Sequence, residues 1–289
     1  MDLSGLLAQI LNGLQYGLLL FLISSGLTLI FGIMGIINLA HGSLFMVGAY
    51  AAFLSVKSFG SLWLALPLGL IGGAVLGALL ERFLFRYFYR REHLDQVLLT
   101  FALILLFEEL RSIVAGNGFH AVEVPALLDF SVAVTRDFSY SAYRLFALAI
   151  CLVLAAVLFH AIHRTRFGAM IRAGADKPEM VQMLGIDVSR VHVAVFAVGT
   201  ALAVVAGMLA APLYSVYPGM GDGFLIISFV VVVIGGIGSV GGAFWAALLI
   251  GLVDTLGKVF LPSVAGIAVY VLMAAVLLLR PSGLFARTQ

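Results

Sequence analysis

Apolar residues run along this chain in long blocks separated by short polar connections. A helix needs about 20 apolar residues to cross a bilayer. We predict membrane helices at residues 8–33, 39–56, 62–80, 96–115, 144–161, 191–212, 226–236, 242–257 and 264–280. The block 226–236 is the shortest, so it is either a half-span or a re-entrant segment, and we expect eight to ten crossings. No strand pattern appears, which predicts an all-α polytopic membrane protein with one domain over residues 1–289.

Two of the apolar stretches are broken by glycine, one near each end of the chain. They are Gly26–Tyr50 and Ile226–Gly251. Discontinuous helices in corresponding places of two halves are typical of a transport site. Glycine also permits close packing of neighbouring helices, so the sequence alone supports both interpretations.

The composition excludes an ordinary water-soluble domain. Of the 289 residues, 63% are hydrophobic and 10% are charged, whereas soluble domains carry about 25% charged residues. The single cysteine, Cys151, lies in an apolar run and can form no internal disulfide. No basic residue precedes the first apolar block, so we interpret that block as mature transmembrane structure and not as a cleaved signal.

Basic residues gather in alternate connections. The segments 82–95 and 160–192, together with the carboxyl-terminal tail, hold most of the Lys and Arg residues. The positive-inside rule places these connections in the cytoplasm. The carboxyl terminus is then cytoplasmic, and nine crossings would place the amino terminus outside.

Polar side chains interrupt the first broken stretch. Intramembrane polar groups are costly, so they either line a transport path or satisfy backbone groups that a helix break has freed. Both roles are open here. The residues that we assign to a candidate translocation path are Asn38, His41, Ser43, Gly32, Gly35, Gly236 and Gly238.

Charged residues inside the predicted helices occur in pairs. Glu108 and Arg111 are three residues apart, and Asp254 and Lys258 are four apart, so each pair shares a helix face. A charge at the bilayer centre costs about 2.5–3.5 kcal/mol on insertion scales, and pairing near a helix end lowers that cost. We predict structural ion pairs near the outer rim, with a substrate gate as the alternative.

The polar connection over residues 162–190 separates two apolar blocks. Pro178 suits a first helical turn, Asp176 is a candidate N-cap and Gly185 is a natural stop. We predict a short helix over 178–184. This helix either docks on a partner or lies on the membrane as an amphipathic connector, through its apolar residues Met180, Val181, Met183 and Leu184.

Motifs of enzymes give little signal. Residues 236–241 match the G-x-G-x-x-G pattern, but predicted membrane helices flank them instead of the βαβ unit that a dinucleotide site needs. The chain has no P-loop motif, no metal-ligand cluster and only scattered histidines. We therefore expect no enzyme, no metal or other cofactor in this chain and no nucleic-acid partner.

Four motifs, in this order, resemble the LivH-type permeases of branched-chain amino-acid ABC importers. They are GLTLIFGIMGIINLAHG (26–42), RAGADKPEMVQMLGID (172–187), VIGGIGSVGGA (233–243) and RPSGLF (280–285). The resemblance implies a permease that forms half of a translocation path in a bacterial inner membrane. It also implies a second related permease, two cytoplasmic subunits that bind ATP and Mg, and a periplasmic binding protein.

The resemblance also implies a coupling role for the second motif. In such importers the cytoplasmic loop of the permease seats in a groove of the ATPase, and closure of the ATPases switches the permease between inward- and outward-facing states. The matching positions run from Gly174 to Ile186. The coupling residues are then Gly174, Ala175, Asp176, Pro178, Glu179, Gly185 and Ile186.

The solute stays open at this point. Relatives commonly carry an acidic residue after the His-Gly pair, whereas this chain has Ser43 after Gly42. Permeases for urea, amides and aromatic or other carboxylic acids resemble the same motifs. An ion-coupled secondary transporter or a channel is the other class, but it would need charges near the midplane, and those of this chain lie near helix ends.

Overall fold

Nine apolar helices occupy the nine predicted blocks in the computed structural model, which describes residues 3–89, 91–135, 138–176 and 178–285. Five of them, α1, α3, α5, α8 and α10, are each long and apolar enough to cross a membrane. The all-α polytopic class is confirmed. The bounds are α1 (Leu3–Met34), α2 (His41–Phe59), α3 (Leu62–Phe83), α4 (His93–Ala115), α5 (Ala142–Arg164), α8 (Val188–Ala210), α9 (Met220–Gly235), α10 (Val240–Phe260) and α11 (Ala265–Leu279).

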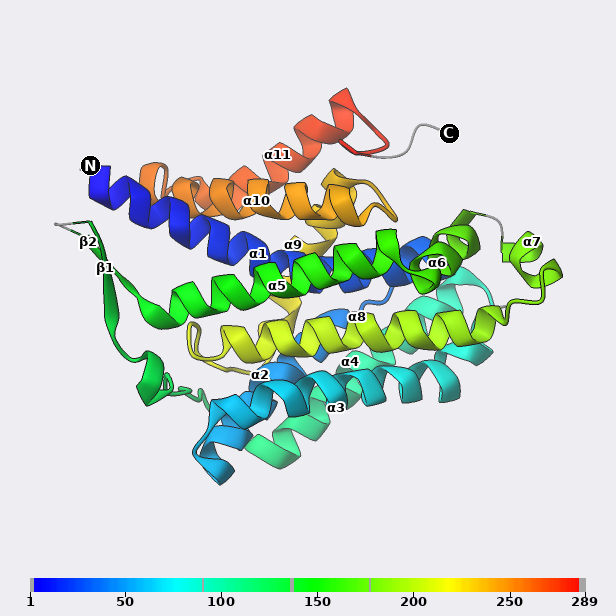
Figure 1. Cartoon of the computed structure of the whole chain (residues 1–289), viewed down its shortest axis with the longest axis horizontal. Coiled ribbons are helices and arrows are strands. Elements are labelled where there is room, and N and C mark those ends of the chain that lie inside the picture. Colours follow the sequence, from blue (N-terminus) through cyan, green and yellow to red (C-terminus); the bar gives the residue numbers. More distant parts are fainter. Residues whose placement is uncertain (1–2, 90, 136–137, 177, 286–289) are drawn as a thin grey trace.

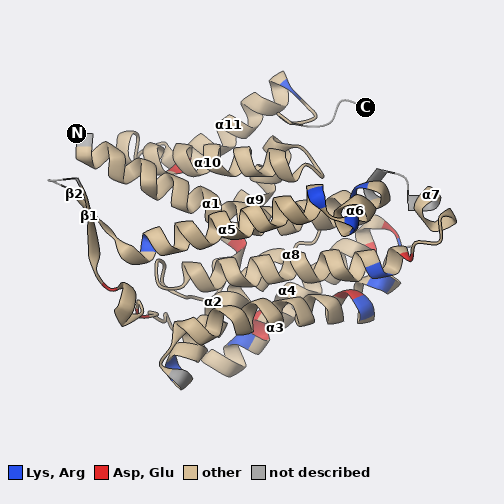
Figure 2. Ribbon diagram, in the orientation of Figure 1, with Lys and Arg blue, Asp and Glu red and all other residues tan. Residues whose placement is uncertain are grey.

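The long helices lie side by side and give the bundle two ends (Figure 1). One end, the α7 end, carries α6 (Arg166–Asp176) and α7 (Pro178–Met183). The opposite end, the hairpin end, carries strands β1 (Ser131–Thr135) and β2 (Phe138–Ser141) and the start of α1. Lys and Arg gather mainly at the α7 end (Figure 2). Two 3-10 turns, η1 (Phe85–Tyr87) and η2 (Ala126–Leu128), lie in connections.

The prediction that the chain has no strand was wrong for one short segment. β1 and β2 pair antiparallel, with Val132 opposite Tyr140 and a register shift between Ala133 and Thr135. The segment Ser131–Thr135 alternates small polar or alanine residues with β-branched ones, which favours a strand. The two strands bond to each other outside the apolar helices, so the membrane part stays helical.

Helices α1 and α8 form the centre of the bundle. Residues 17–30 of α1 and 199–210 of α8 are buried on all sides. The outer helices instead expose large apolar side chains, such as Leu68, Ile71 and Leu278. An apolar surface of this kind suits lipid as the solvent.

Glycines allow the central helices to approach closely. A Cβ atom at Gly26 would lie 2.6 Å from the carbonyl oxygen of Gly199 on α8. A Cβ atom at Gly17 would lie 2.7 Å from the carbonyl oxygen of Ala247 on α10. Close packing through small residues therefore holds α1 against both neighbours.

Candidate functional site

Both glycine-broken stretches are discontinuous in the structure. The break between α1 and α2 covers residues 35–40, and that between α9 and α10 covers residues 236–239. Gly35 has a φ of 67° and Gly236 has a φ of 92°. Residues with a side chain rarely adopt these left-handed values, so glycine is required where each helix ends.

The two breaks lie against each other. A Cβ atom at Gly32 would lie 2.7 Å from the Cα atom of Gly238, and one at Gly283 would lie 2.7 Å from the Cα atom of Gly236. The backbone N–H of Leu284 donates to the carbonyl oxygen of Ile234 at 2.8 Å. Three of the four sequence motifs therefore meet at one junction, which the sequence did not predict.

The polar residues of the first break are buried within the chain. Asn38, His41 and Ser43 have exposed fractions of 1%, 0% and 4%. The Nε2 atom of His41 lies 3.0 Å from the carbonyl oxygen of Ile23 on α1. Both side-chain polar atoms of Asn38, and Nδ1 of His41, contact no hydrogen-bonding partner among the residues that the structure describes. A place on the translocation path stays a prediction for these residues.

The connection 162–190 folds as two helices, one more than predicted. The additional helix α6 folds back onto the end of α5, where the Arg172 guanidinium donates to the carbonyl oxygen of Ile162. Helix α7 ends where the sequence indicated. Gly185 has a φ of 79°, and its N–H donates to the carbonyl oxygen of Gln182 at 2.9 Å.

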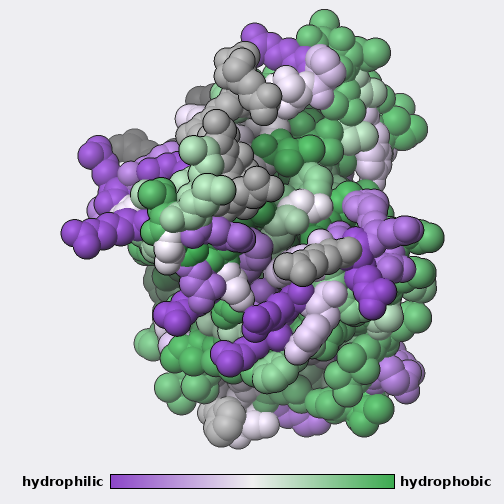
Figure 3. Space-filling view, turned by 90° about the vertical axis from the view of Figure 1, so that its right-hand side faces the viewer, coloured by the Kyte–Doolittle hydropathy of each residue, from purple (hydrophilic) through white to green (hydrophobic). Residues whose placement is uncertain are grey.

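Helix α7 and the residue after it expose apolar side chains. They lie at an end of the molecule where hydrophilic patches alternate with hydrophobic ones (Figure 3). Met183 is 85% exposed and Leu184 is 79% exposed, whereas Val181 is buried. Exposed apolar side chains on a short helix outside the bundle favour a partner surface.

Several predicted coupling residues lie partly outside the described residues. Lys177 is not described, nor are the side chains of Ala175, Asp176, Pro178 and Glu179. In the backbone, Asp176 is the last residue of α6 and Pro178 the first of α7. The N-cap at Asp176 therefore stays a prediction.

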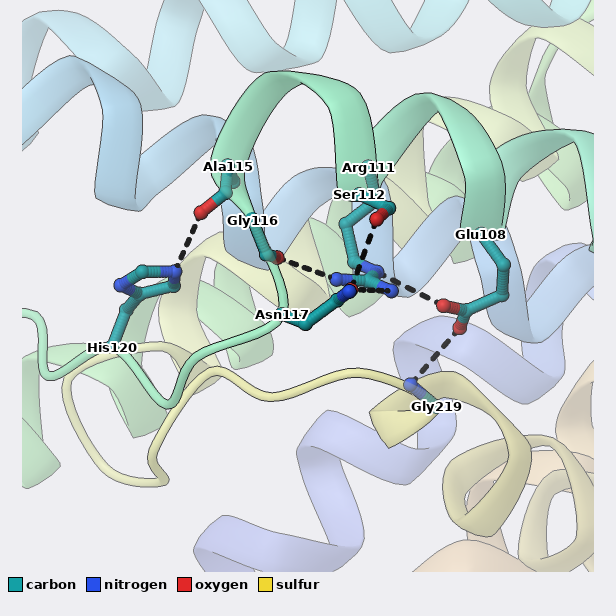
Figure 4. Close-up of polar contacts among 8 residues, drawn as sticks. All are labelled: Glu108, Arg111, Ser112, Ala115, Gly116, Asn117, His120 and Gly219. Carbon is teal, nitrogen blue, oxygen red and sulfur yellow. Dashed lines mark hydrogen bonds and ion pairs between the residues drawn. The ribbon is translucent and has the colours of Figure 1, made fainter.

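The first ion pair predicted from the sequence is present and holds two segments together. The Nε atom of Arg111 lies 2.9 Å from Oε2 of Glu108. The other carboxylate oxygen of Glu108 accepts the N–H of Gly219 at 2.9 Å, just before α9 begins (Figure 4). Arg111 also donates to the carbonyl oxygen of Gly116 at 2.7 Å. The predicted pairing is confirmed, the contact with the start of α9 is additional to it, and the structural role stays a prediction.

A cavity lined by both polar and apolar residues lies at the hairpin end. Its volume is about 420 Å³, within the range of about 300–1,000 Å³ that small-molecule sites cover. In the sequence, the polar residues within α1 and α10 gave only a weak indication of this cavity. The lining residues are Gln9, Asn12, Tyr16, Arg144, Tyr214, Tyr217, Met220, Gly223, Phe224, Ile227, Asp254, Thr255, Lys258 and Val259.

The cationic side of this cavity is fixed by hydrogen bonds between α1, β2 and α5. Arg144 donates through Nη1 to Oδ1 of Asn12 at 2.9 Å and to Oε1 of Gln15 at 3.3 Å. The Tyr140 hydroxyl donates to the same Asn12 oxygen at 2.9 Å. Burial raises the pKa of Tyr140, so this hydroxyl keeps its proton.

The second predicted ion pair also lines this cavity. Lys258 Nζ lies 2.6 Å from Oδ2 of Asp254, so this pair is also confirmed. The same ammonium group lies 5.8 Å from the centroid of the Tyr16 ring, within the range of a cation–π contact. The cavity therefore combines both signs of charge with aromatic rings.

The enzyme motifs considered in the sequence form no recognisable site among the described residues. Residues 236–241 join two membrane helices and belong to no βαβ unit. Within the described part of the chain, no three His, Cys, Asp or Glu side chains gather as metal ligands. Cys151 is a buried free thiol.

Comparison with known proteins identifies the family of this chain. The sequence pattern of a family described as "Branched-chain amino acid transport system / permease component" matches residues 9–280. The high-affinity branched-chain amino acid transport system permease proteins LivH of Escherichia coli and BraD of Pseudomonas aeruginosa are each 29% identical over an alignment of 300 positions, which covers 98% of this chain and 96% of theirs.

A third relative shows the same similarity. The probable branched-chain amino acid transport permease protein LivH of Methanocaldococcus jannaschii is 30% identical over an alignment of 294 positions, which covers 96% of this chain and 91% of that protein. No solved structure matches. The similarity extends over all nine apolar helices and both glycine breaks.

Proposed function

The chain belongs to the family of branched-chain amino acid transport permease components, and from that premise we propose that it is the permease subunit of an ATP-driven importer of branched-chain amino acids. The observation that carries the proposal is the family match over residues 9–280, from within α1 to the end of α11. A permease subunit is a transport component and not an enzyme. This role is favoured over an ion-coupled transporter or a channel acting alone.

In the proposed assembly this chain forms half of the translocation path and a second related permease forms the other half. Two cytoplasmic subunits bind ATP and Mg, a periplasmic binding protein delivers the solute, and this chain itself needs no cofactor. The membrane is the bacterial inner membrane, with the α7 end and the carboxyl terminus in the cytoplasm. The gathering of Lys and Arg at the α7 end supports that orientation (Figure 2).

Helix α7 is the proposed contact with the ATP-binding subunit. Val181 is buried, while Met183 and Leu184 are exposed and can enter a groove. A push on α7 would reach α5 through α6, which is bonded to the end of α5. The coupling residues remain the same set: Gly174, Ala175, Asp176, Pro178, Glu179, Gly185 and Ile186.

The junction of the two breaks is the proposed moving part of the path. Gly32, Gly35, Gly236 and Gly238 end or join helices there without side chains that would block a shift. The neighbouring Asn38 and His41 carry polar atoms that have no partner in the described structure, and Ser43 lies beside them. A second arrangement of the helices would give these atoms partners or solute.

The first test is uptake into proteoliposomes that contain this chain with its partner permease, ATPases and binding protein. We expect uptake of leucine, isoleucine or valine that requires both ATP and the binding protein. Uptake of urea, an amide or an aromatic acid instead would keep the mechanism and change the solute, with Ser43 the first position to vary. Uptake by this chain alone, indifferent to ATP, would contradict the proposal.

The coupling role is tested with Leu184→Ser in the same proteoliposomes. We expect ATP hydrolysis to continue while uptake falls by about tenfold, because the apolar contact with the ATPase is lost. Leu127→Ser is the matched control, since Leu127 is 75% exposed in η2 at the opposite end. Equal uptake in the two variants would remove α7 from the coupling contact.

A further inference from the structure

The cavity at the hairpin end contains a cation with no carboxylate partner. Arg144 is half-buried, and its hydrogen bonds reach two neutral oxygens, on Asn12 and Gln15, both through Nη1. No described Asp or Glu oxygen forms an ion pair with it. A guanidinium has five N–H donors in a planar fork, so Arg144 retains donors for a ligand. A carboxylate is the group that this fork binds best, in a bidentate manner.

Asp254 on α10 supplies the opposite charge in the same cavity. Its side chain is 10% exposed, and its hydrogen bond in the described structure is to Lys258 at 2.6 Å. A carboxylate accepts up to about four hydrogen bonds. The bond to Lys258 uses one of these acceptor positions, so Asp254 retains acceptor capacity for a second ammonium group.

Apolar and aromatic side chains form an apolar wall of the same cavity. Phe224 and Ile227 of α9 line the cavity. The Phe224 ring packs against Tyr16 and Tyr214, with centroid distances of 6.3 Å and 5.9 Å. This packing holds the apolar wall in place, which favours a ligand with a compact apolar side chain.

We infer that the cavity is a binding site of the permease for a zwitterionic α-amino acid. Arg144 binds the carboxylate, Asp254 binds the ammonium group, and Phe224 and Ile227 contact the apolar side chain. The inference rests on the proposed function and specifies the residues that recognise the solute. The cavity lies at the hairpin end, the end that the proposed orientation turns toward the binding protein (Figure 1).

The carboxylate, the ammonium group and the apolar side chain of the ligand distinguish this site from one for the other candidate solutes. Urea and amides carry neither charge, so neither Arg144 nor Asp254 would select them. An aromatic acid carries the carboxylate alone and would depend on Arg144 but not on Asp254. Dependence on both residues is therefore specific to an amino acid.

The test is binding of radiolabelled leucine to the purified complex of permeases and ATPases in nanodiscs, without the binding protein. Competitors are leucinamide, which lacks the carboxylate, and 4-methylpentanoate, which lacks the amine. The variants are Arg144→Gln, Arg144→Lys and Asp254→Asn. Lys57→Gln is the control, because Lys57 is an exposed cation on α2 that does not line the cavity.

We expect Arg144→Gln to weaken leucine binding at least about tenfold and to leave leucinamide binding within about twofold of the parent protein. Arg144→Lys keeps the charge but loses the planar fork, so its affinity for leucine should lie between that of the parent protein and that of Arg144→Gln. Asp254→Asn should weaken leucine but not 4-methylpentanoate. Lys57→Gln should bind like the parent protein.

Three results would overturn the site. The first is undiminished leucine binding in Arg144→Gln. The second is an equal loss of leucine and leucinamide binding in that variant, which would indicate a purely structural role. The third is no leucine binding by the parent complex. If Arg144→Gln does not assemble, Arg144→Lys and Asp254→Asn decide by the same criteria. If these variants leave ATP-driven leucine uptake unchanged, this site alone is overturned. If the parent protein shows no ATP-driven leucine uptake, the proposed function is overturned.

Discussion

Single glycines decide how closely α1 can approach its neighbours. The carbonyl oxygen of Gly199 occupies the space that a side chain at Gly26 would need. Gly72 on α3 is different, because nothing lies within 4 Å of the place where its Cβ would stand. Two glycines inside membrane helices therefore have opposite tolerance for the same substitution.

We expect Gly26→Ala to destabilise the protein by about 1–3 kcal/mol, since the added methyl group forces α1 and α8 apart. Gly72→Ala should be neutral or stabilising by up to about 1 kcal/mol, because alanine favours a helix over glycine. Unfolding of the two purified variants in the same detergent measures the difference. Equal stability would mean that α1 and α8 do not pack as described.

At the scale of elements, one carboxylate joins α4 to the start of α9. Glu108 accepts the N–H of Gly219, whose φ of 74° directs the chain into α9. The amino end of a helix carries a partial positive charge, so an anion there is favourable. Arg111 holds the same carboxylate from the other side, which fixes the geometry of this outer connection.

Glu108→Ala should lower the free energy of unfolding by about 1–3 kcal/mol, because it leaves the Gly219 N–H and Arg111 without their acceptor. Glu109→Ala is the matched control on the same helix, where the side chain is exposed, and it should change stability by less than about 0.5 kcal/mol. Chemical denaturation of both variants gives the comparison. A larger loss in the control would contradict the capping role.

At the scale of the whole molecule, the proposed orientation turns the α7 end toward the cytoplasm and the hairpin end toward the other side of the membrane. Cys151 is fully buried, so it does not interfere with labelling of introduced cysteines. A membrane-impermeant maleimide should label Ser131→Cys in intact cells, and Gln182→Cys only after the cells are permeabilised. The parent protein should remain unlabelled. The reverse pattern would invert the orientation and move the cavity to the cytoplasmic side.

The sequence determined the helices, because a chain in lipid must satisfy its backbone hydrogen bonds internally and cover each crossing with apolar side chains. Local chemistry also determined both glycine breaks, the stop at Gly185 and the two ion pairs, since each involves residues within a few positions. The hairpin escaped prediction because short strands leave a weak periodic signal. The sequence of α6 is strongly amphipathic, so its periodicity could have predicted that helix.

Only the tertiary structure decided which distant residues meet. Gly32, Gly238 and Gly283 form one junction although more than 200 positions separate the first from the last. Arg144 and Asp254 reach one cavity from different helices for the same reason. In a membrane, contacts between helices depend on shape and small residues and not on a contrast between apolar and polar faces. The hydropathy pattern therefore gives the helices but carries little information about which of their faces pack together.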